Sequence, residues 1–160
     1  MNTEKTIEKI KNIDWEEYNG PEYFSPSEVI ESLCHLVLLT EDHQKPDVYN
    51  SVLFAIGNNH AGTYYPVIRE ALHFILEVAV EGDSEVARNC ALDILTDLYM
   101  SFVPDTDEST KFTAAELKGF VEKEMKGYEP VFLEILSAGK DSERNLNLIL
   151  DILDAIKKRS

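Results

Sequence analysis

Residues 66–102, PVIREALHFILEVAVEGDSEVARNCALDILTDLYMSF, determine the predicted fold. Apolar residues recur at steps of three and four through both halves of this stretch, which is the spacing of one face of an α-helix. Gly82 separates the halves as a helix-ending residue, and Asp83 or Ser84 can cap the helix that follows. The stretch therefore predicts two amphipathic helices joined by a short turn.

The same arrangement recurs on both sides of this stretch. Ser25, Pro26 and Glu28 have the pattern of a capping box with proline at the first helical position. Pro46 begins the helix that pairs with this one, and Pro130 opens a further pair near the end of the chain. The sequence thus predicts a series of helical hairpins.

Three helix pairs begin at Pro26, Pro66 and Pro130. The first two starts are 66 − 26 = 40 residues apart, and the third follows after 130 − 66 = 64 because a polar loop and a helix are inserted. A repeat near 40 residues with one hairpin per unit is typical of an α-solenoid. No segment alternates as a β-strand does, so we predict an all-α array of about eight helices without a sheet.

We expect the chain to form a single helical domain, because 160 residues suffice for one hydrophobic core. The expected parts are an aromatic and acidic N-terminal cap at 1–24, two clear helix pairs at 25–103, the loop and inserted helix at 104–127, and a C-terminal pair at 128–160.

The helix pairs resemble HEAT repeats. Pro66 opens a first helix as in that repeat, and Asp83-Ser-Glu-Val-Ala-Arg88 resembles its aspartate turn followed by valine and arginine. Arg88 lies one place later than in the usual pattern, which puts its customary bond to the aspartate in doubt. The resemblance covers residues 25–103 well and 128–158 loosely. It implies a superhelical stack of antiparallel helix pairs, which is a fold and not a function.

The net charge of the chain lies in its N-terminal two-thirds. Residues 1–110 contain 21 acidic and 6 basic residues, giving 6 − 21 = −15, whereas residues 111–160 contain 9 of each. Such a field repels nucleic acids and anionic membranes and attracts cationic molecules. We therefore expect a cationic protein partner, no direct nucleic-acid binding and no membrane binding.

The sequence favours a cytoplasmic protein. Residues 1–11 alternate charge with isolated isoleucines, unlike a signal peptide, and no stretch approaches the roughly 20 apolar residues of a membrane helix. Cys34 and Cys90 lie in apolar helical patterns, which predicts reduced, buried thiols.

Catalytic motifs are missing from the sequence. Glu70 and His73 form one Glu-x-x-His pair, whereas carboxylate-bridged di-iron bundles use two such pairs. Neither a glycine-rich phosphate loop with its lysine nor a Gly-x-Ser-x-Gly motif occurs. We predict that the protein is not an enzyme and uses no cofactor or metal. A metal-dependent enzyme built on Glu70, His73 and Glu77 is the weaker alternative.

A second resemblance concerns function. The segment Trp15-Glu-Glu-Tyr-Asn-Gly-Pro21 and the loop Gly57-Asn-Asn-His-Ala-Gly-Thr-Tyr-Tyr-Pro66, in a small acidic protein, are similar to immunity proteins of bacterial contact-dependent inhibition and polymorphic toxin systems. The resemblance implies stoichiometric binding of a cognate toxin, often a nuclease, whose cationic groove the carboxylates would occupy in place of phosphates. The alternative is a generic HEAT-type adaptor that binds a folded protein or peptide.

The predicted partner-binding residues lie in one loop, on one helix face and on the inserted loop. They are Asn59, His60, Tyr64, Tyr65, Asp93, Asp97, Asp105, Asp107 and Glu108. Tyrosine and histidine suit interface anchors, although Tyr64 and Tyr65 could instead pack the junction between repeats. The aspartates are expected to be exposed, and the alternative for them is an ordinary solvated face. Trp15 is expected to close the apolar end of the first repeat.

Overall fold

A computed structural model describes residues 1–18, 20 and 23–160, so part of the aromatic segment predicted at 15–21 lies outside the described residues. The α-helices are α1 (Thr3–Asn12), α2 (Pro26–Leu38), α3 (Lys45–Ile56), α4 (Ile68–Glu81), α5 (Glu85–Thr96), α6 (Ala114–Gly127), α7 (Glu129–Ala138) and α8 (Glu143–Lys158). The 3₁₀ turns η1 (Trp15–Glu17) and η2 (Asp42–Gln44) precede α2 and α3, and the π-helical turn η3 (Asp97–Ser101) continues α5. The prediction of a mostly helical chain is confirmed.

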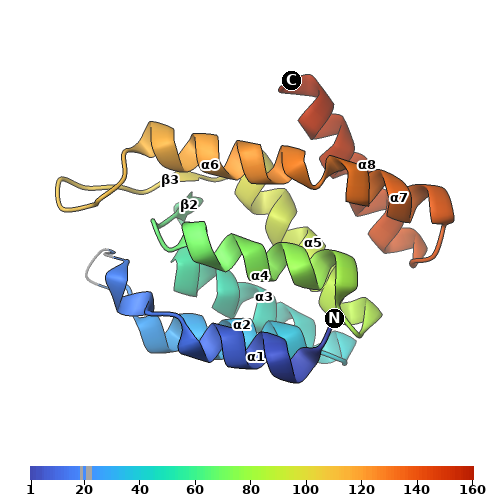
Figure 1. The fold of residues 1–160 in the computed structure, drawn as a ribbon, viewed down its shortest axis with the longest axis horizontal. Coiled ribbons are helices and arrows are strands. Elements are labelled where there is room, and N and C mark those ends of the chain that lie inside the picture. The colour runs from blue at the N-terminus through green and yellow to red at the C-terminus, as the bar shows by residue number, and fades with distance from the viewer. Residues whose placement is uncertain (19, 21–22) are drawn as a thin grey trace.

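The helices pack in pairs, and the pairs pack on one another (Figure 1). Helix α2 pairs with α3, α4 with α5, and α7 with α8. The second helices form one layer, in which α3 packs on α5 and α5 on α8, while α2 packs on α4 in the other layer. The inserted helix α6 lies against α4 (Figure 1). None of the helices in the described part of the chain has the length and apolar character needed to cross a membrane.

The prediction that the fold has no sheet is wrong. Strands β1 (Gly57–Asn58), β2 (Thr63–Tyr64) and β3 (Val103–Pro104) form a small sheet, with β1 antiparallel and β3 parallel to β2. Each strand has two residues, which is too short for alternation to be visible in the sequence. A Cβ atom at Gly57 would lie 1.9 Å from the Thr63 carbonyl oxygen, so glycine is required for this close pairing.

The N-terminal segment packs onto α2 and α4. Trp15 is buried, as its predicted capping role requires, and its indole N–H donates to the Ile10 carbonyl at 2.7 Å. Its ring lies 6.2 Å from that of Phe74, between centroids. The Tyr18 hydroxyl donates to the Glu70 carboxylate at 2.9 Å. These contacts fasten α1 and η1 to the helix pairs.

A line of polar side chains connects the second helices of the three pairs. Lys45 on α3 donates to Asn89 on α5, and the Asn89 side-chain amide donates to Asn145 on α8 at 2.9 Å. Asn89 and Asn145 are both buried. Buried polar groups that are hydrogen-bonded in a chain fix how the helices stack.

Arg88 makes a connection that the sequence did not predict. Its Nε and Nη2 donate to Asp141 at 2.9 and 3.1 Å, and its Nη1 donates to the Gly82 carbonyl at 2.7 Å. The arginine therefore reaches the turn of the following helix pair.

Both cysteines are free thiols, with Cys90 buried as expected and Cys34 only half-buried.

Candidate functional site

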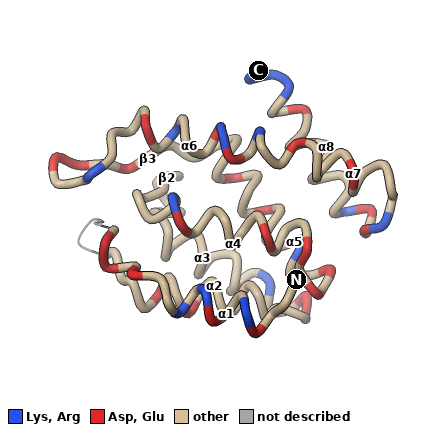
Figure 2. The backbone as a smooth tube through the Cα atoms, viewed as in Figure 1, with Lys and Arg blue, Asp and Glu red and all other residues tan. Residues whose placement is uncertain are grey.

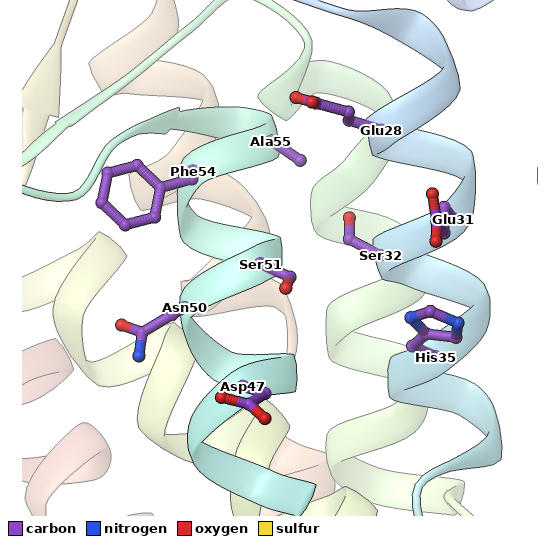
Figure 3. Close-up of a pocket in the computed structure, with 9 residues that line it drawn as sticks. All are labelled: Glu28, Glu31, Ser32, His35, Asp47, Asn50, Ser51, Phe54 and Ala55. Atoms are coloured by element: carbon purple, nitrogen blue, oxygen red, sulfur yellow. The ribbon is translucent and has the colours of Figure 1, made fainter.

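A groove of about 500 Å³ lies between α2 and α3 (Figure 3). It is lined by Glu28, Glu31, Ser32 and His35 of α2 and by Asp47, Asn50, Ser51, Phe54 and Ala55 of α3. On each helix these residues are spaced by three or four positions, so each helix contributes one polar stripe beside its apolar one. Two polar stripes that face each other produce the groove.

Small side chains form the floor of the groove. Ser32 and Ala55 are each 3% exposed, and Figure 3 shows them with Ser51 between the two helices. Because these side chains are short, space remains above them instead of an interdigitated contact. The Ser32 hydroxyl donates to the Val29 carbonyl at 3.2 Å, so its hydrogen bond is made within α2.

The walls of the groove carry unbalanced negative charge. Glu28, Glu31 and Asp47 are exposed, and the described residues that line the groove include no lysine or arginine. None of the three carboxylates accepts a hydrogen bond or forms a salt bridge within the part of the chain that the structure describes. Ser25, which was predicted to form a capping box with Glu28, makes no side-chain capping bond, and Glu28 contributes to the groove instead. The groove can attract a cation without first breaking an internal ion pair.

One rim of the groove is aromatic and contacts the predicted loop. Phe54 is 42% exposed and points to the side of α3 away from α2 (Figure 3). The His60 ring lies edge-on to it, with the centroids 4.9 Å apart. The Asn59 amide donates to the Asn50 side chain at 3.1 Å. Asn59 and His60, both predicted from the sequence, therefore adjoin the groove.

The prediction that Tyr64 and Tyr65 offer anchor area to a partner is wrong. They are 2% and 6% exposed, and burial raises the pKa of Tyr64 to about 12. Tyr64 lies in β2, and the Tyr65 ring packs edge-on against Phe24 with the centroids 6.3 Å apart. The two rings pack the junction between helix pairs, which was the alternative interpretation.

Asp93 and Asp97 lie in a second groove, of about 380 Å³, between α3 and α5. They are half-buried and not exposed as expected. Lys45 forms a salt bridge with Asp93, and the Tyr49 hydroxyl donates to Asp97. Burial, together with the bond to Asp97, raises the pKa of Tyr49, which keeps its hydroxyl protonated as a donor.

The predicted acidic residues of the inserted loop are placed elsewhere. Asp105 accepts a hydrogen bond from the Thr63 hydroxyl at 3.1 Å, next to the small sheet. Asp107 accepts from the Ser109 hydroxyl at 2.6 Å and its backbone N–H at 2.8 Å, which lowers the pKa of Asp107. Glu108 is exposed. Figure 2 shows acidic residues in this loop, and basic residues both on α1 and near the C-terminus.

Sequence reasoning missed Glu28, Glu31, Asp47, Asn50 and Phe54 as site residues. Their signal was present as two polar stripes at helical spacing on neighbouring helices, 28–35 and 47–54. Polar stripes on helices usually face solvent, and only the packing of α2 on α3 shows that these two face each other.

The residues of the alternative metal site do not converge. The Glu70 carboxylate accepts a hydrogen bond from the Tyr18 hydroxyl. The Nδ1 atom of His73 lies 3.9 Å from the Glu124 carboxylate oxygen Oε2. Among the described residues, no group of three or more histidine, cysteine, aspartate or glutamate side chains is arranged to hold a metal ion.

Comparison of the chain with protein-family models, curated proteins and solved structures finds no match.

Proposed function

We propose that the protein binds a cationic protein partner stoichiometrically and that the α2–α3 groove is its docking point. The observation that supports this is a groove of about 500 Å³ with three exposed carboxylates and no lysine or arginine among the described residues that line it. In its most concrete form the proposal is an immunity protein that occludes a basic toxin, such as a nuclease. The helix pairs would form a HEAT-like stack that holds the groove rigid.

The groove suits a lysine or arginine side chain of the partner. Glu28, Glu31 and Asp47 would pair with its charge, and the Phe54 ring, which points away from α2, would contact the partner at the outer rim of the groove. The net charge of −15 would steer the partner toward the protein, which increases the association rate more than the lifetime of the complex.

The second candidate is an adaptor that binds a peptide in the α3–α5 groove. Pro46 and Tyr49 give this groove an apolar part that could accept a side chain. Its carboxylates are already bonded within the protein, so the net charge would contribute less to binding there. Substitutions in the two grooves therefore distinguish the two functions.

The test uses the basic product of a neighbouring toxin gene, co-expressed and purified with this protein. We expect a 1:1 complex that Glu28→Gln/Glu31→Gln/Asp47→Asn weakens about ten- to a hundredfold, because each exposed ion pair contributes roughly 0.2–1 kcal/mol. The matched control is Glu4→Gln/Glu8→Gln/Glu41→Gln, which removes the same charge from exposed positions outside the groove.

Titration calorimetry at two salt concentrations measures the affinity of both variants for the toxin. Equal weakening by the two triple variants would show that net charge alone drives binding, against a specific groove. Loss of binding on Tyr49→Ala with no effect of the groove variant would favour the adaptor. The absence of a complex between the wild-type proteins would contradict the immunity function.

A further inference from the structure

Helix α8 carries two apolar stripes. Ile149, Ile152 and Ile156 are at most 1% exposed and face the core. A second stripe consists of Leu146, Leu150 and Leu153, of which Leu150 is 47% exposed. These leucines follow steps of four and three, the spacing of a seam between paired helices. Leu153 packs partly against the core, so Leu150 is the exposed residue of the second stripe.

Leu150 is the midpoint of a line of exposed residues. Glu143, Leu150 and Lys157 are separated by seven residues each, so they lie on one face of α8, two turns apart. Neither Glu143 nor Lys157 forms a salt bridge within the described chain, whereas the nearby Asp154 is paired with Lys158 at 2.6 Å. The line therefore presents an unpaired acid, a leucine and an unpaired base in order.

We propose that the protein forms a symmetric dimer through antiparallel packing of α8 against α8 of a second copy. The twofold axis would pass at Leu150, with Leu146 and Leu153 on either side. Seven residues at 1.5 Å each place Glu143 and Lys157 about 10 Å from the axis in opposite directions. Antiparallel packing thus sets Glu143 against the partner's Lys157 twice, as an isologous interface requires.

The charge of the molecule favours a second copy at this face. Residues 111–160 have a net charge of zero, whereas residues 1–110 carry −15 and repel the same part of another copy. Packing through α8 brings the neutral parts together. Helix α8 lies at the edge of the helical stack (Figure 1), and Leu150 at its middle is 47% exposed.

The last helix pair also has apolar residues among the polar ones of its outer face, where the terminal pair of a helical stack needs polar side chains. Besides Leu150, the exposed apolar residues include Val131 and Leu133 of α7, at 37% and 47%. A copy packed on α8 would remove Leu150 from water and leave the α2–α3 groove, on the first helix pair, uncovered. The dimer is therefore independent of the proposed partner binding.

Sedimentation equilibrium of the full-length protein from about 1 to 300 μM tests the dimer. We expect a mass that approaches twice 18.2 kDa as concentration increases. Leu150→Glu should weaken dimerisation at least about a hundredfold, since it sets two carboxylates together at the axis. Leu38→Glu is the matched control, because Leu38 is 54% exposed on α2, and it should change nothing. Circular dichroism checks that both variants fold.

Charge reversal identifies the geometry. Glu143→Lys or Lys157→Glu alone should weaken the dimer about three- to tenfold, and the two changes together should restore it. A monomer at every concentration would overturn the proposal, as would a dimer indifferent to Leu150→Glu. A double variant as weak as the sum of its parts would overturn the antiparallel arrangement. If Leu150→Glu instead abolished toxin binding by a monomeric protein, the face would belong to that partner.

Discussion

Two acidic grooves lie on either side of α3, and they differ in whether their carboxylates are already bonded. The α2–α3 groove has Glu28, Glu31 and Asp47, and no lysine or arginine is among the described residues that line it. In the α3–α5 groove, Arg144 pairs with Asp42 at 2.8 Å, Lys45 with Asp93, and Tyr49 donates to Asp97. Each groove has three carboxylates, and only those of the second have partners.

The difference shows that acidic residues serve two purposes in one molecule. In the α3–α5 groove they hold three helix pairs in register, because Lys45 and Arg144 come from different pairs. In the α2–α3 groove they form no hydrogen bond or salt bridge with the described residues and retain their attraction for an external cation. We therefore place the proposed binding function at the groove whose charges do not stabilise the fold.

The largest expected loss of stability comes from substituting Asn89, which is hydrogen-bonded to Lys45 and Asn145. Asn89→Ala removes one of the two acceptors of Lys45 and leaves the buried Asn145 side chain without its Asn89 partner. We expect a loss of about 2–3 kcal/mol in the free energy of unfolding, measured by urea denaturation. Asn50→Ala, at the exposed rim of the other groove, should cost under about 0.5 kcal/mol. Equal losses in both variants would contradict the distinction between the grooves.

A smaller effect is expected from the pH dependence of Glu85. Arg144 donates two hydrogen bonds to it, at 2.8 and 2.7 Å, and these lower the pKa of Glu85 to about 2 from its ordinary 4.5. Because the folded pKa is depressed, this contribution to stability is complete above pH 4.5. It is lost as the pH falls from 4.5 through 2.

Glu85→Gln should accordingly be less stable than the wild type at pH 7 by about 1 kcal/mol, a value kept small because the pair is partly exposed. The difference between the two proteins should disappear as the pH approaches about 2. Urea denaturation of both proteins from pH 7 to 2.5 measures this. A difference that stays constant over this range would show that Glu85 stabilises the fold by packing and not by charge.

The helix pairs could be predicted from the sequence because their signals are local. Capping residues, prolines and apolar spacing act within one helix, and Gly82 marked a real helix end. The sheet could not be predicted, because its three strands become visible only when β2 meets β3 from forty residues away. Tyr64 lies in β2 and is buried in the folded chain. From the sequence alone, this residue could be either a partner-binding anchor or part of the core.

The candidate site was predicted only at its edge. Asn59 and His60 were recognised by their residue types in a loop, but the carboxylates beside them resembled any solvated helix face. Whether an aspartate is available for binding depends on distant cations. Arg144, for example, lies 102 residues from the Asp42 that it pairs with. No count of charges along the chain reveals that pairing.

The smallest expected effects are changes in the free energy of unfolding. They have opposite signs in the α2–α3 groove and in the α3–α5 groove. Glu31 lies one turn from Glu28 on α2 and lines the same groove as Asp47, with no lysine or arginine among the described lining residues. Glu31→Gln should therefore stabilise the protein by up to about 0.5 kcal/mol at pH 8 and low salt. Asp93→Asn, which removes the partner of Lys45, should instead destabilise it by about 1 kcal/mol. At 1 M salt the gain from Glu31→Gln should vanish, since the screening length falls to about 3 Å. A loss of stability in Glu31→Gln would mean that this carboxylate supports the fold, and the groove would then resemble its neighbour instead of differing from it.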